Sequence, residues 1–455
     1  MRNFTKLALH WRILIGMFAG ILFSWLLLQT SWGQKTTSLS GAETKQAVAF
    51  VRHWIKPFGD IFINALKLIA VPLILASLIK GIADLKEISK LSKLGFKTLG
   101  VYLLTTVFAV SVGLAVVNVV KPGNSISEET RNDLVEAYGV STETDVVSKA
   151  QNEKLLREKI GPLKPLIDVV PNNIFEAAAD NRNMLQVIFF AILFGIGLIL
   201  VPDGKADTVK SFFDGLNEII LKVIDIIMLF APFAVFALMA NLIAEAPSAD
   251  LFAALGKYAG TVVVGLLILL STYLLVVWYY TKITPGTFLK AISPAQLLAF
   301  STSSSAATLP VTMERVEEKL GVDSEVASFV LPLGATINMD GTSLYQGVAA
   351  VFIAQAFGMD LSLGEQLGIL AAAVLASIGS AAVPSAGMVM LVIVLGQAGI
   401  PEAGLALIFA IDRPLDMMRT VVNVTGDASV ATLLAKNLGK IHTPVERVWN
   451  EKFEK

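Results

Sequence analysis

The last long apolar block of the sequence, residues 405–434, carries acidic, basic and amide side chains at helical spacing. At about 100° of rotation per helical residue, one face spanning roughly 80° gathers most of them: Asp412, Asp416, Arg419, Asn423 and Asp427. Arg413 lies next to this face. Ionisable side chains are costly inside a bilayer, so a stripe of them indicates a site for a substrate or for ions. A self-neutralising stripe that only docks helices is the alternative.

A second polar interruption, residues 338–342 (NMDGT), lies inside the apolar block 326–357. Asn338 and Asp340 offer oxygen atoms, and Gly341 permits unusual backbone conformations. Together with Asn423 and Asp427 they make an oxygen-only set of donors. Such a set suits a hard cation such as Na⁺ better than a transition metal. A simple kinked helix is the alternative interpretation.

Two further interruptions contain serine, at residues 301–310 and at residues 377–387. A serine nucleophile would need a histidine or lysine base, and the nearest lysine downstream of the first run, Lys319, lies beyond Pro310. The sequence has no cysteine, and its three histidines lie near segment ends. We therefore expect no enzymatic activity and no zinc site, and interpret the serines as backbone or ligand partners.

The elements that hold these residues must lie in a membrane. Of the 455 residues, 55% are hydrophobic and only 16% are charged, whereas a soluble domain has roughly 25% charged residues. The formal net charge of -1 gives no support for nucleic-acid binding. Six apolar runs precede the interrupted segments: 13–28, 58–82, 99–120, 187–201, 219–243 and 259–280. A polar stretch at 121–164 predicts an aqueous loop.

Polar or broken backbone at membrane depth is tolerated only inside protein or along a watery cavity. Paired interrupted segments mark the binding site of secondary transporters. Basic residues cluster at the N-terminus, after the second run and in the tail, while the turn near Glu245 and Asp250 has none. This distribution predicts a multi-pass cell-membrane protein with both termini in the cytoplasm.

The sequence resembles the glutamate/aspartate transporter family, the dicarboxylate/amino acid:cation symporters that include the excitatory amino acid transporters. Four motifs carry the resemblance, in the order and spacing of the family: 303–310 (SSSAATLP), 331–342 (LPLGATINMDGT), 377–384 (SIGSAAVP) and 416–427 (DMMRTVVNVTGD). The resemblance implies an all-α fold of eight transmembrane helices plus two re-entrant helical hairpins, at 288–309 and 367–395. It also implies a homotrimer surrounded by lipid and an elevator mechanism.

The same resemblance divides the chain into a scaffold and a moving transport domain. The scaffold would comprise 11–86 and 165–246, and the transport domain 94–122 and 251–436. An extracellular loop at 123–164 and a cytoplasmic tail at 437–455 would complete the chain.

Carried over residue by residue, the resemblance implies that Arg419 holds the substrate side-chain carboxylate and that Asp416 holds the α-ammonium. Further substrate contacts would come from the side chains or backbone of Thr342, Thr420, Asn423, Ser305, Val383 and Gly387. No organic cofactor is implied. The coupling ion would be Na⁺, bound by three sets of residues: Gly334, Asn338, Asn423 and Asp427; Thr336, Ser377, Ile378 and Ser380; and Tyr102, Thr105, Thr106, Asn338 and Asp340.

Arg413 departs from the family pattern, which places an arginine at the position of Ser303 or of Met417 instead. We hypothesise that Arg413 reaches the same region and balances Asp416 or Asp412. The resulting prediction is a Na⁺-coupled symporter of aspartate or glutamate. A C4-dicarboxylate or neutral amino acid symporter of the same fold is the alternative, and an ion channel is a more distant one. One methylene group changes pocket affinity by only about 1–3 kcal/mol, so aspartate and glutamate remain equal candidates.

Overall fold

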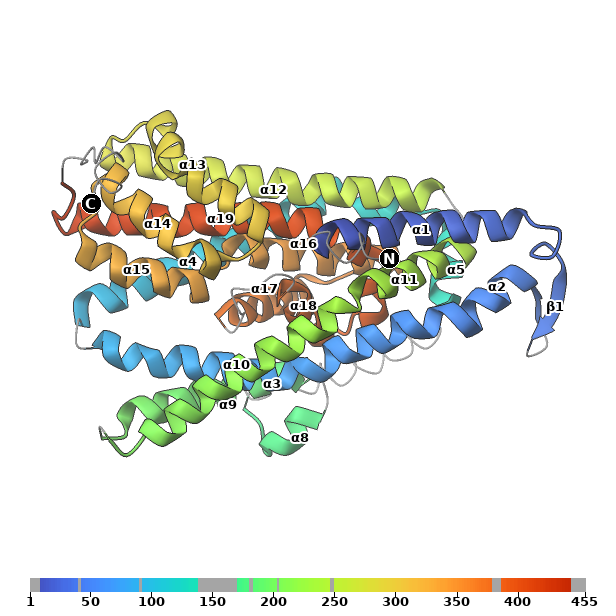
Figure 1. The fold of residues 1–455 in the computed structure, drawn as a ribbon, viewed down its shortest axis with the longest axis horizontal. Coiled ribbons are helices and arrows are strands. Elements are labelled where there is room, and N and C mark those ends of the chain that lie inside the picture. Colours follow the sequence, from blue (N-terminus) through green and yellow to red (C-terminus); the bar gives the residue numbers. More distant parts are fainter. Residues whose placement is uncertain are drawn as a thin grey trace, which may run out of the picture.

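The computed structural model of the chain describes residues 9–39, 42–89, 92–137, 170–179, 183–202, 204–245, 249–378 and 386–442. Long helices dominate these ranges and run along the length of an elongated molecule (Figure 1). The elements up to residue 245 are α1 Leu9–Gln29, β1 Thr36–Leu39, β2 Ala42–Lys45, α2 Gln46–Phe50, η1 Val51–Ile55, α3 Lys56–Ser89, α4 Ser92–Val120, η2 Pro122–Ser125, α5 Glu128–Ala137, α8 Ile174–Ala179, α9 Met184–Leu200, α10 Asp207–Leu229 and α11 Ala231–Glu245.

The elements after residue 248 hold the interrupted segments. They are α12 Ala249–Thr281, α13 Pro285–Thr302, α14 Ser305–Leu320, α15 Ser324–Ile337, α16 Asp340–Ala356, α17 Leu363–Ile378, α18 Ala386–Gln397, η4 Glu402–Gly404 and α19 Leu405–Asn437. Two of the predicted breaks are clear. Ser303 takes a left-handed conformation (φ 51°) between α13 and α14. Asn338 leaves helical geometry (φ -93°, ψ 83°) between α15 and α16. Residues 379–385, between α17 and α18, lie outside the described ranges.

Within the described ranges, four helical runs are long and apolar enough to cross a membrane: Trp11–Gln29, Gln46–Lys80, Leu94–Ser125 and Asp250–Thr281. A fifth results if α10 and α11, which meet at 50°, count as one bent span. The bend falls at Phe230, because Pro232 in the first turn of α11 has no backbone N–H to continue the ladder of α10. A helical membrane protein is therefore confirmed, while the count of eight spans stays a prediction.

The expectation of an all-α chain needs one small correction. Strands β1 and β2 form an antiparallel hairpin, with Thr36 opposite Lys45 and Leu39 opposite Ala42. Threonine is favoured in strands, and this segment contains three of them, Thr36, Thr37 and Thr44. The predicted loop after residue 122 is also partly helical, since it contains α5. Its residues 138–169 lie outside the described ranges.

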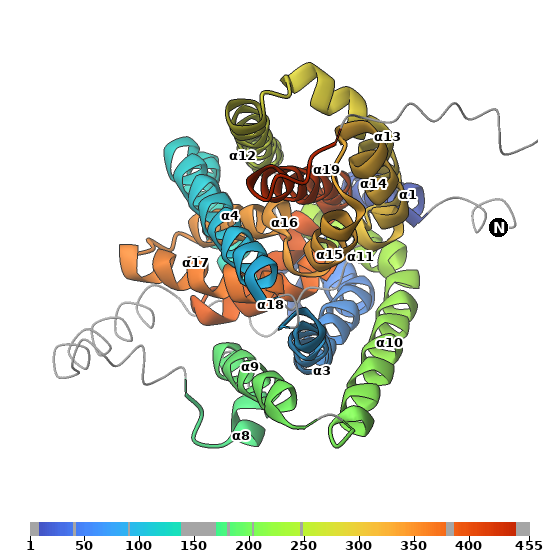
Figure 2. The same cartoon turned by 90° about the vertical axis from the view of Figure 1, so that its left-hand side faces the viewer.

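Helix α19 lies inside the bundle, and its polar face is enclosed by protein. Helices α12, α13, α14, α15 and α16 all pack against it, as the end-on view in Figure 2 shows. A second group of helices packs mainly among itself: α1 lies against α11, and α3 lies against α9, α10 and α11. The charged stripe predicted on α19 is thus positioned among the helices that carry the other interruptions.

Candidate functional site

Four buried charged side chains form a continuous series of ion pairs along α19. Arg413 Nη1 lies 3.0 Å from Asp416 Oδ2, and Arg419 Nη2 lies 2.8 Å from Asp416 Oδ1. Arg419 Nη1 lies 3.0 Å from Asp412 Oδ1, although neither of these two atoms makes a hydrogen bond in the described part of the chain. Of the two partners hypothesised for Arg413, the structure places it against Asp416.

The guanidinium of Arg419 is fully enclosed, with 0% of the side chain exposed. It lies 3.7 Å from the ring centroid of Tyr345, where a cation is attracted to the aromatic face. Among the described residues, Nε and Nη1 of Arg419 have no hydrogen-bond partner. A buried donor without a partner costs about 1–3 kcal/mol. The arrangement therefore keeps two donors in position for an anion, and a carboxylate matches their spacing.

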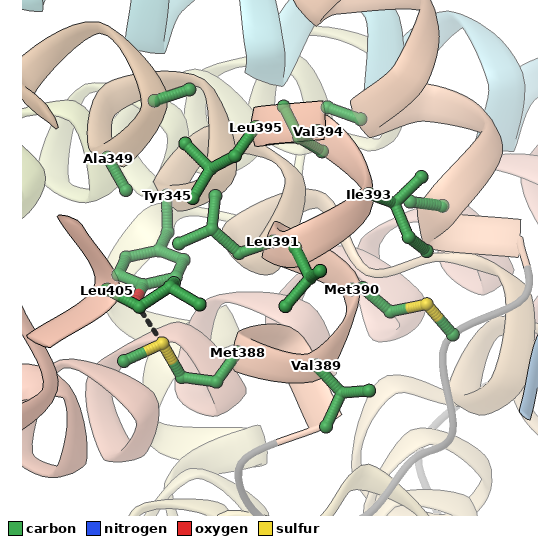
Figure 3. Packing of buried hydrophobic residues seen from close by; sticks show 14 of the residues in the cluster. Tyr345, Ala349, Met388, Val389, Met390, Leu391, Ile393, Val394, Leu395 and Leu405 are labelled. Carbon is green, nitrogen blue, oxygen red and sulfur yellow. Dashed lines mark hydrogen bonds between the residues drawn. The ribbon is translucent and has the colours of Figure 1, made fainter. Parts of the chain in front are cut away.

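Helices α16 and α18 form the walls beside Arg419. Figure 3 shows Tyr345 of α16 and Met388 of α18 pointing toward each other, and the Tyr345 hydroxyl lies 3.3 Å from the Met388 sulfur. A Cβ atom at Gly387 would lie 2.9 Å from Thr342 Cγ2 and 3.8 Å from Arg419 Cζ. The absence of a side chain at Gly387 therefore lets α18 lie against Thr342, next to the guanidinium.

Asn423 links this charged series to the break between α15 and α16. Its Oδ1 accepts a hydrogen bond from Gly341 N at 2.8 Å, and its Nδ2 donates to Thr342 Oγ1 at 3.3 Å. Thr420, one turn after Asp416, donates to the backbone oxygen of Asp416 at 2.8 Å. The predicted substrate residues of α16 and α19 are thus brought together.

The carboxylate of Asp427 is held at the end of α15. Asn338 Nδ2 donates to Asp427 Oδ1 at 2.9 Å. A Cβ atom at Gly334 would clash with both Asp427 Oδ1 and the Tyr102 hydroxyl, so a side chain there would displace these groups. The Tyr102 hydroxyl donates to the backbone oxygen of Val330 at 3.0 Å. Residues from α4, α15 and α19 therefore converge on this carboxylate.

Asp340, fully buried at the start of α16, is the second carboxylate of the network. Thr106 donates to its Oδ1 at 2.7 Å, and Tyr273 of α12 donates to its Oδ2. Thr105 donates to Asn338 Oδ1 at 3.2 Å. The predicted set on α4 thus meets the predicted set at the helix break.

The remaining predicted site residues do not all join this network. Ser305 is buried at the N-terminus of α14, next to Ser304, whose hydroxyl accepts from Ala307 N and caps the helix. Ser377 donates to the Ile337 backbone oxygen at 3.2 Å. Thr336 is exposed, and its hydroxyl donates to backbone oxygens of its own helix, those of Pro332 and Leu333. Ser380, Val383 and the side chain of Ile378 lie outside the described residues.

Sequence reasoning missed Tyr273 and Tyr345. A buried tyrosine hydroxyl needs a hydrogen-bond partner. Tyr273, inside the long apolar run of α12, could therefore have been recognised as a residue with a polar partner. Tyr345 follows Thr342 by three residues, which makes the two side chains neighbours on one helix face. Their partners could not be read from the sequence, because each partner comes from another helix.

The oxygen atoms around Asp340 and Asp427 suit a monovalent cation as ligands. Within the described residues, no group of three or more histidine, aspartate or glutamate side chains could hold a metal ion. The network instead combines single carboxylates with amide, hydroxyl and backbone oxygen atoms. Such a hard, weakly charged set is suited to Na⁺ and lacks the nitrogen and sulfur ligands that transition metals prefer.

Comparison with known proteins points in the same direction. Residues 9–437 match the model of the sodium:dicarboxylate symporter family. The chain is 36% identical over 384 residues to the proton/sodium-glutamate symport protein of Bacillus subtilis (strain 168), covering 84% of this chain and 86% of that protein. It is 31% identical over 455 residues to the proton/glutamate-aspartate symporter of Escherichia coli (strain K12), covering 100% of this chain and 95% of that protein.

An animal protein is similar at the same level. The chain is 37% identical over 403 residues to excitatory amino acid transporter 3 of Mus musculus, covering 81% of this chain and 76% of that protein. The aligned stretches are long in all three comparisons, so the similarity extends well beyond the four motifs that first indicated it.

Proposed function

Because the chain belongs to the sodium:dicarboxylate symporter family, we propose that it is a Na⁺-coupled symporter of aspartate or glutamate. The resemblance indicated by the four motifs is confirmed, and so is the prediction of a transporter rather than an enzyme. Its spanning-capable helices make it a membrane protein. We place it in the cell membrane with both termini in the cytoplasm.

One observation carries the proposed substrate. Arg419 is enclosed and has two unsatisfied donors, and it lies beside the carboxylate of Asp416. An acidic amino acid offers a matching pair of groups, a side-chain carboxylate for the guanidinium and an ammonium for Asp416. The carboxylate would displace Asp412 from Arg419 Nη1, where the ion pair lacks hydrogen-bond geometry.

The remaining substrate contacts follow from the elements around this pair. Thr342, Thr420 and Asn423 supply hydroxyl and amide groups. Backbone N–H groups at the N-terminus of α14, around Ser305, favour the α-carboxylate, since a helix N-terminus attracts anions. Gly387 lies next to Thr342 and Arg419 and completes the wall beside them. Val383 completes the proposed set.

Sodium would bind where the break between α15 and α16 meets α4 and α19. Asp427 and Asp340 supply charge, and neutral oxygen donors surround them. The proposed sets remain those of the sequence analysis, with Thr336, Ser377, Ile378 and Ser380 forming a separate site. The names of the Bacillus subtilis and Escherichia coli relatives include the proton, so a proton is the competing coupling ion for this chain.

We further propose that the helices packed around α19 move as a transport domain against a scaffold built from α1, α3 and α9 to α11. Support comes from the way these two groups pack mainly among themselves. The eight-span count, the elevator motion and the homotrimer belong to the same proposal.

Uptake into proteoliposomes tests the proposed function. Purified protein is reconstituted, and uptake of labelled aspartate, glutamate, succinate and serine is compared under an inward Na⁺ gradient, under an inward proton gradient without Na⁺, and with neither gradient. We expect aspartate or glutamate to accumulate only with Na⁺. Equal accumulation without Na⁺ would contradict sodium coupling, and stronger uptake of serine would contradict the acidic substrate.

A further inference from the structure

Both carboxylate oxygens of Asp416 are held by arginine side chains. Arg413 Nη1 holds Oδ2 at 3.0 Å in a hydrogen-bonded ion pair, and Arg419 Nη2 holds Oδ1 at 2.8 Å. Arg413 is itself buried, with 7% of its surface exposed. Substrate recognition in the proposed function needs only Arg419 and Asp416, so the second arginine calls for a separate explanation.

Charge balance gives the first part of that explanation. Arg413, Asp416, Arg419 and Asp412 carry two positive and two negative charges, so the series is neutral before a substrate binds. Without Arg413, Asp416 and Asp412 would share a single guanidinium. A buried carboxylate that lacks a partner is costly. Arg413 therefore pairs with Asp416 when no ammonium group is present.

Specificity for an amino group normally depends on the cost of leaving a buried carboxylate without a partner. A site built to hydrogen-bond a polar substrate group rejects an analogue without it by about 10⁴-fold to 10⁵-fold, because the buried protein group is left unpaired. Asp416 is not left unpaired here, since Arg413 already occupies Oδ2. A dicarboxylate without an amino group would consequently meet a neutral, satisfied site.

We propose that Arg413 is a specificity-determining residue: by pairing with Asp416 in place of the substrate ammonium, it lets C4-dicarboxylates without an amino group compete for the amino acid site. This inference rests on the proposed function. Arg419 would hold one carboxylate of either ligand, and Asp416 would accept the ammonium only when the ligand has one. A carboxylate has about four lone-pair sites, so Asp416 can accept an ammonium while Arg413 stays bound.

The first test uses the wild-type protein in proteoliposomes. Succinate is aspartate without its amino group, so the pair isolates the contribution of the ammonium. We expect unlabelled succinate to inhibit Na⁺-driven aspartate uptake at roughly 100-fold excess or less, well below the discrimination of an ammonium-requiring site. Aspartate uptake that resists an excess of about 10⁴-fold succinate would overturn the inference while leaving the proposed function intact.

The second test compares variants. Arg413→Gln removes the charge, and we expect the ratio of the succinate inhibition constant to the aspartate KM to rise roughly tenfold or more, toward the full discrimination. Arg413→Lys retains a cation and should keep the ratio closer to wild type. Arg315→Gln is the matched control, because Arg315 is engaged elsewhere, with its Nε bonded to the Ala291 backbone oxygen at 2.8 Å.

A folded Arg413→Gln protein that keeps the wild-type ratio would overturn the assignment of specificity to Arg413. A merely structural role would weaken both ligands together and leave the ratio unchanged. Absence of aspartate uptake by the wild type under any Na⁺ gradient would instead refute the proposed function itself, so the two failures are distinguishable.

Discussion

At the scale of single residues, a glycine on α18 determines how closely this helix approaches the site. Gly387 lets α18 lie against Thr342 and Arg419, since a Cβ atom there would lie only 2.9 Å from Thr342 Cγ2. Thr342 in turn accepts from Asn423, which links the charged series of α19 to the break before α16. Space beside Arg419 is therefore set by backbone proximity and not only by side chains.

Gly387→Ala should weaken aspartate binding. The added methyl group forces Thr342 to shift, and overpacking of this kind costs about 1–3 kcal/mol, which corresponds to a roughly tenfold or larger rise in KM. Initial uptake rates at saturating Na⁺ measure the change. Gly368→Ala on α17 is the matched control, because a Cβ atom there would meet nothing within 4 Å. Unchanged KM in Gly387→Ala would contradict the close-contact role.

At the scale of elements, the sequence predicts the interrupted segments well and the connections poorly. Polar residues inside apolar runs indicated the breaks at Ser303 and Asn338, because such residues are tolerated at membrane depth only for a reason. The β1–β2 hairpin and the bend between α10 and α11 were not predicted. Pairing across helices, such as Tyr273 with Asp340, depends on packing and leaves no local pattern.

A further contact between distant elements lies at the end of the described residues. The segment after α19 pairs with the turn between α14 and α15, through a bridge of Val322 with Ile441 and a hydrogen bond from His442 N to the Gly321 backbone oxygen at 2.7 Å. His442 Nε2 also lies 3.1 Å from Asp323 Oδ2. This hydrogen bond to His442 lowers the pKa of Asp323 from its usual value.

Stability should therefore depend on pH through Asp323. Because its folded-state pKa is lowered, its stabilising effect is present above the unfolded pKa of about 3.9 and is lost as the pH falls through the folded value. Asp323→Asn keeps a capping side chain at the start of α15 but removes the charge. We expect a lower thermal midpoint than wild type at pH 6, with the difference shrinking as the pH falls through the folded-state pKa of Asp323. A pH-independent difference would contradict the charge effect.

At the scale of the whole molecule, the two groups of helices contact each other through apolar and charged side chains. Phe62 of α3 packs edge-on against Phe409 of α19, with ring centroids 5.0 Å apart. Lys67 of α3 lies 2.6 Å from Glu402, just before α19. If the groups slide past each other during transport, these contacts must break in every cycle.

Linking the two groups should therefore stop transport. The sequence has no cysteine, so Phe62→Cys with Phe409→Cys introduces the only thiols available for bridging by mercuric ion. We expect aspartate uptake to be lost on bridging and restored by excess thiol. Phe194→Cys with Phe213→Cys is the control, since these rings lie 5.4 Å apart within the second group. Full uptake by the bridged Phe62 and Phe409 pair would contradict relative motion at this contact.

The central claim is that one connected network binds the acidic amino acid and sodium together. Asn423 hydrogen-bonds to both Gly341 and Thr342, between Arg419 and the carboxylate of Asp427. Coupling between two sites is reciprocal, and symport requires it to be positive, so we expect sodium to raise substrate affinity. The most direct measurement is the Kd of purified protein for aspartate across a range of Na⁺ concentrations at constant ionic strength. We predict that Kd falls steeply as Na⁺ replaces choline, and a Kd independent of Na⁺ would contradict the account.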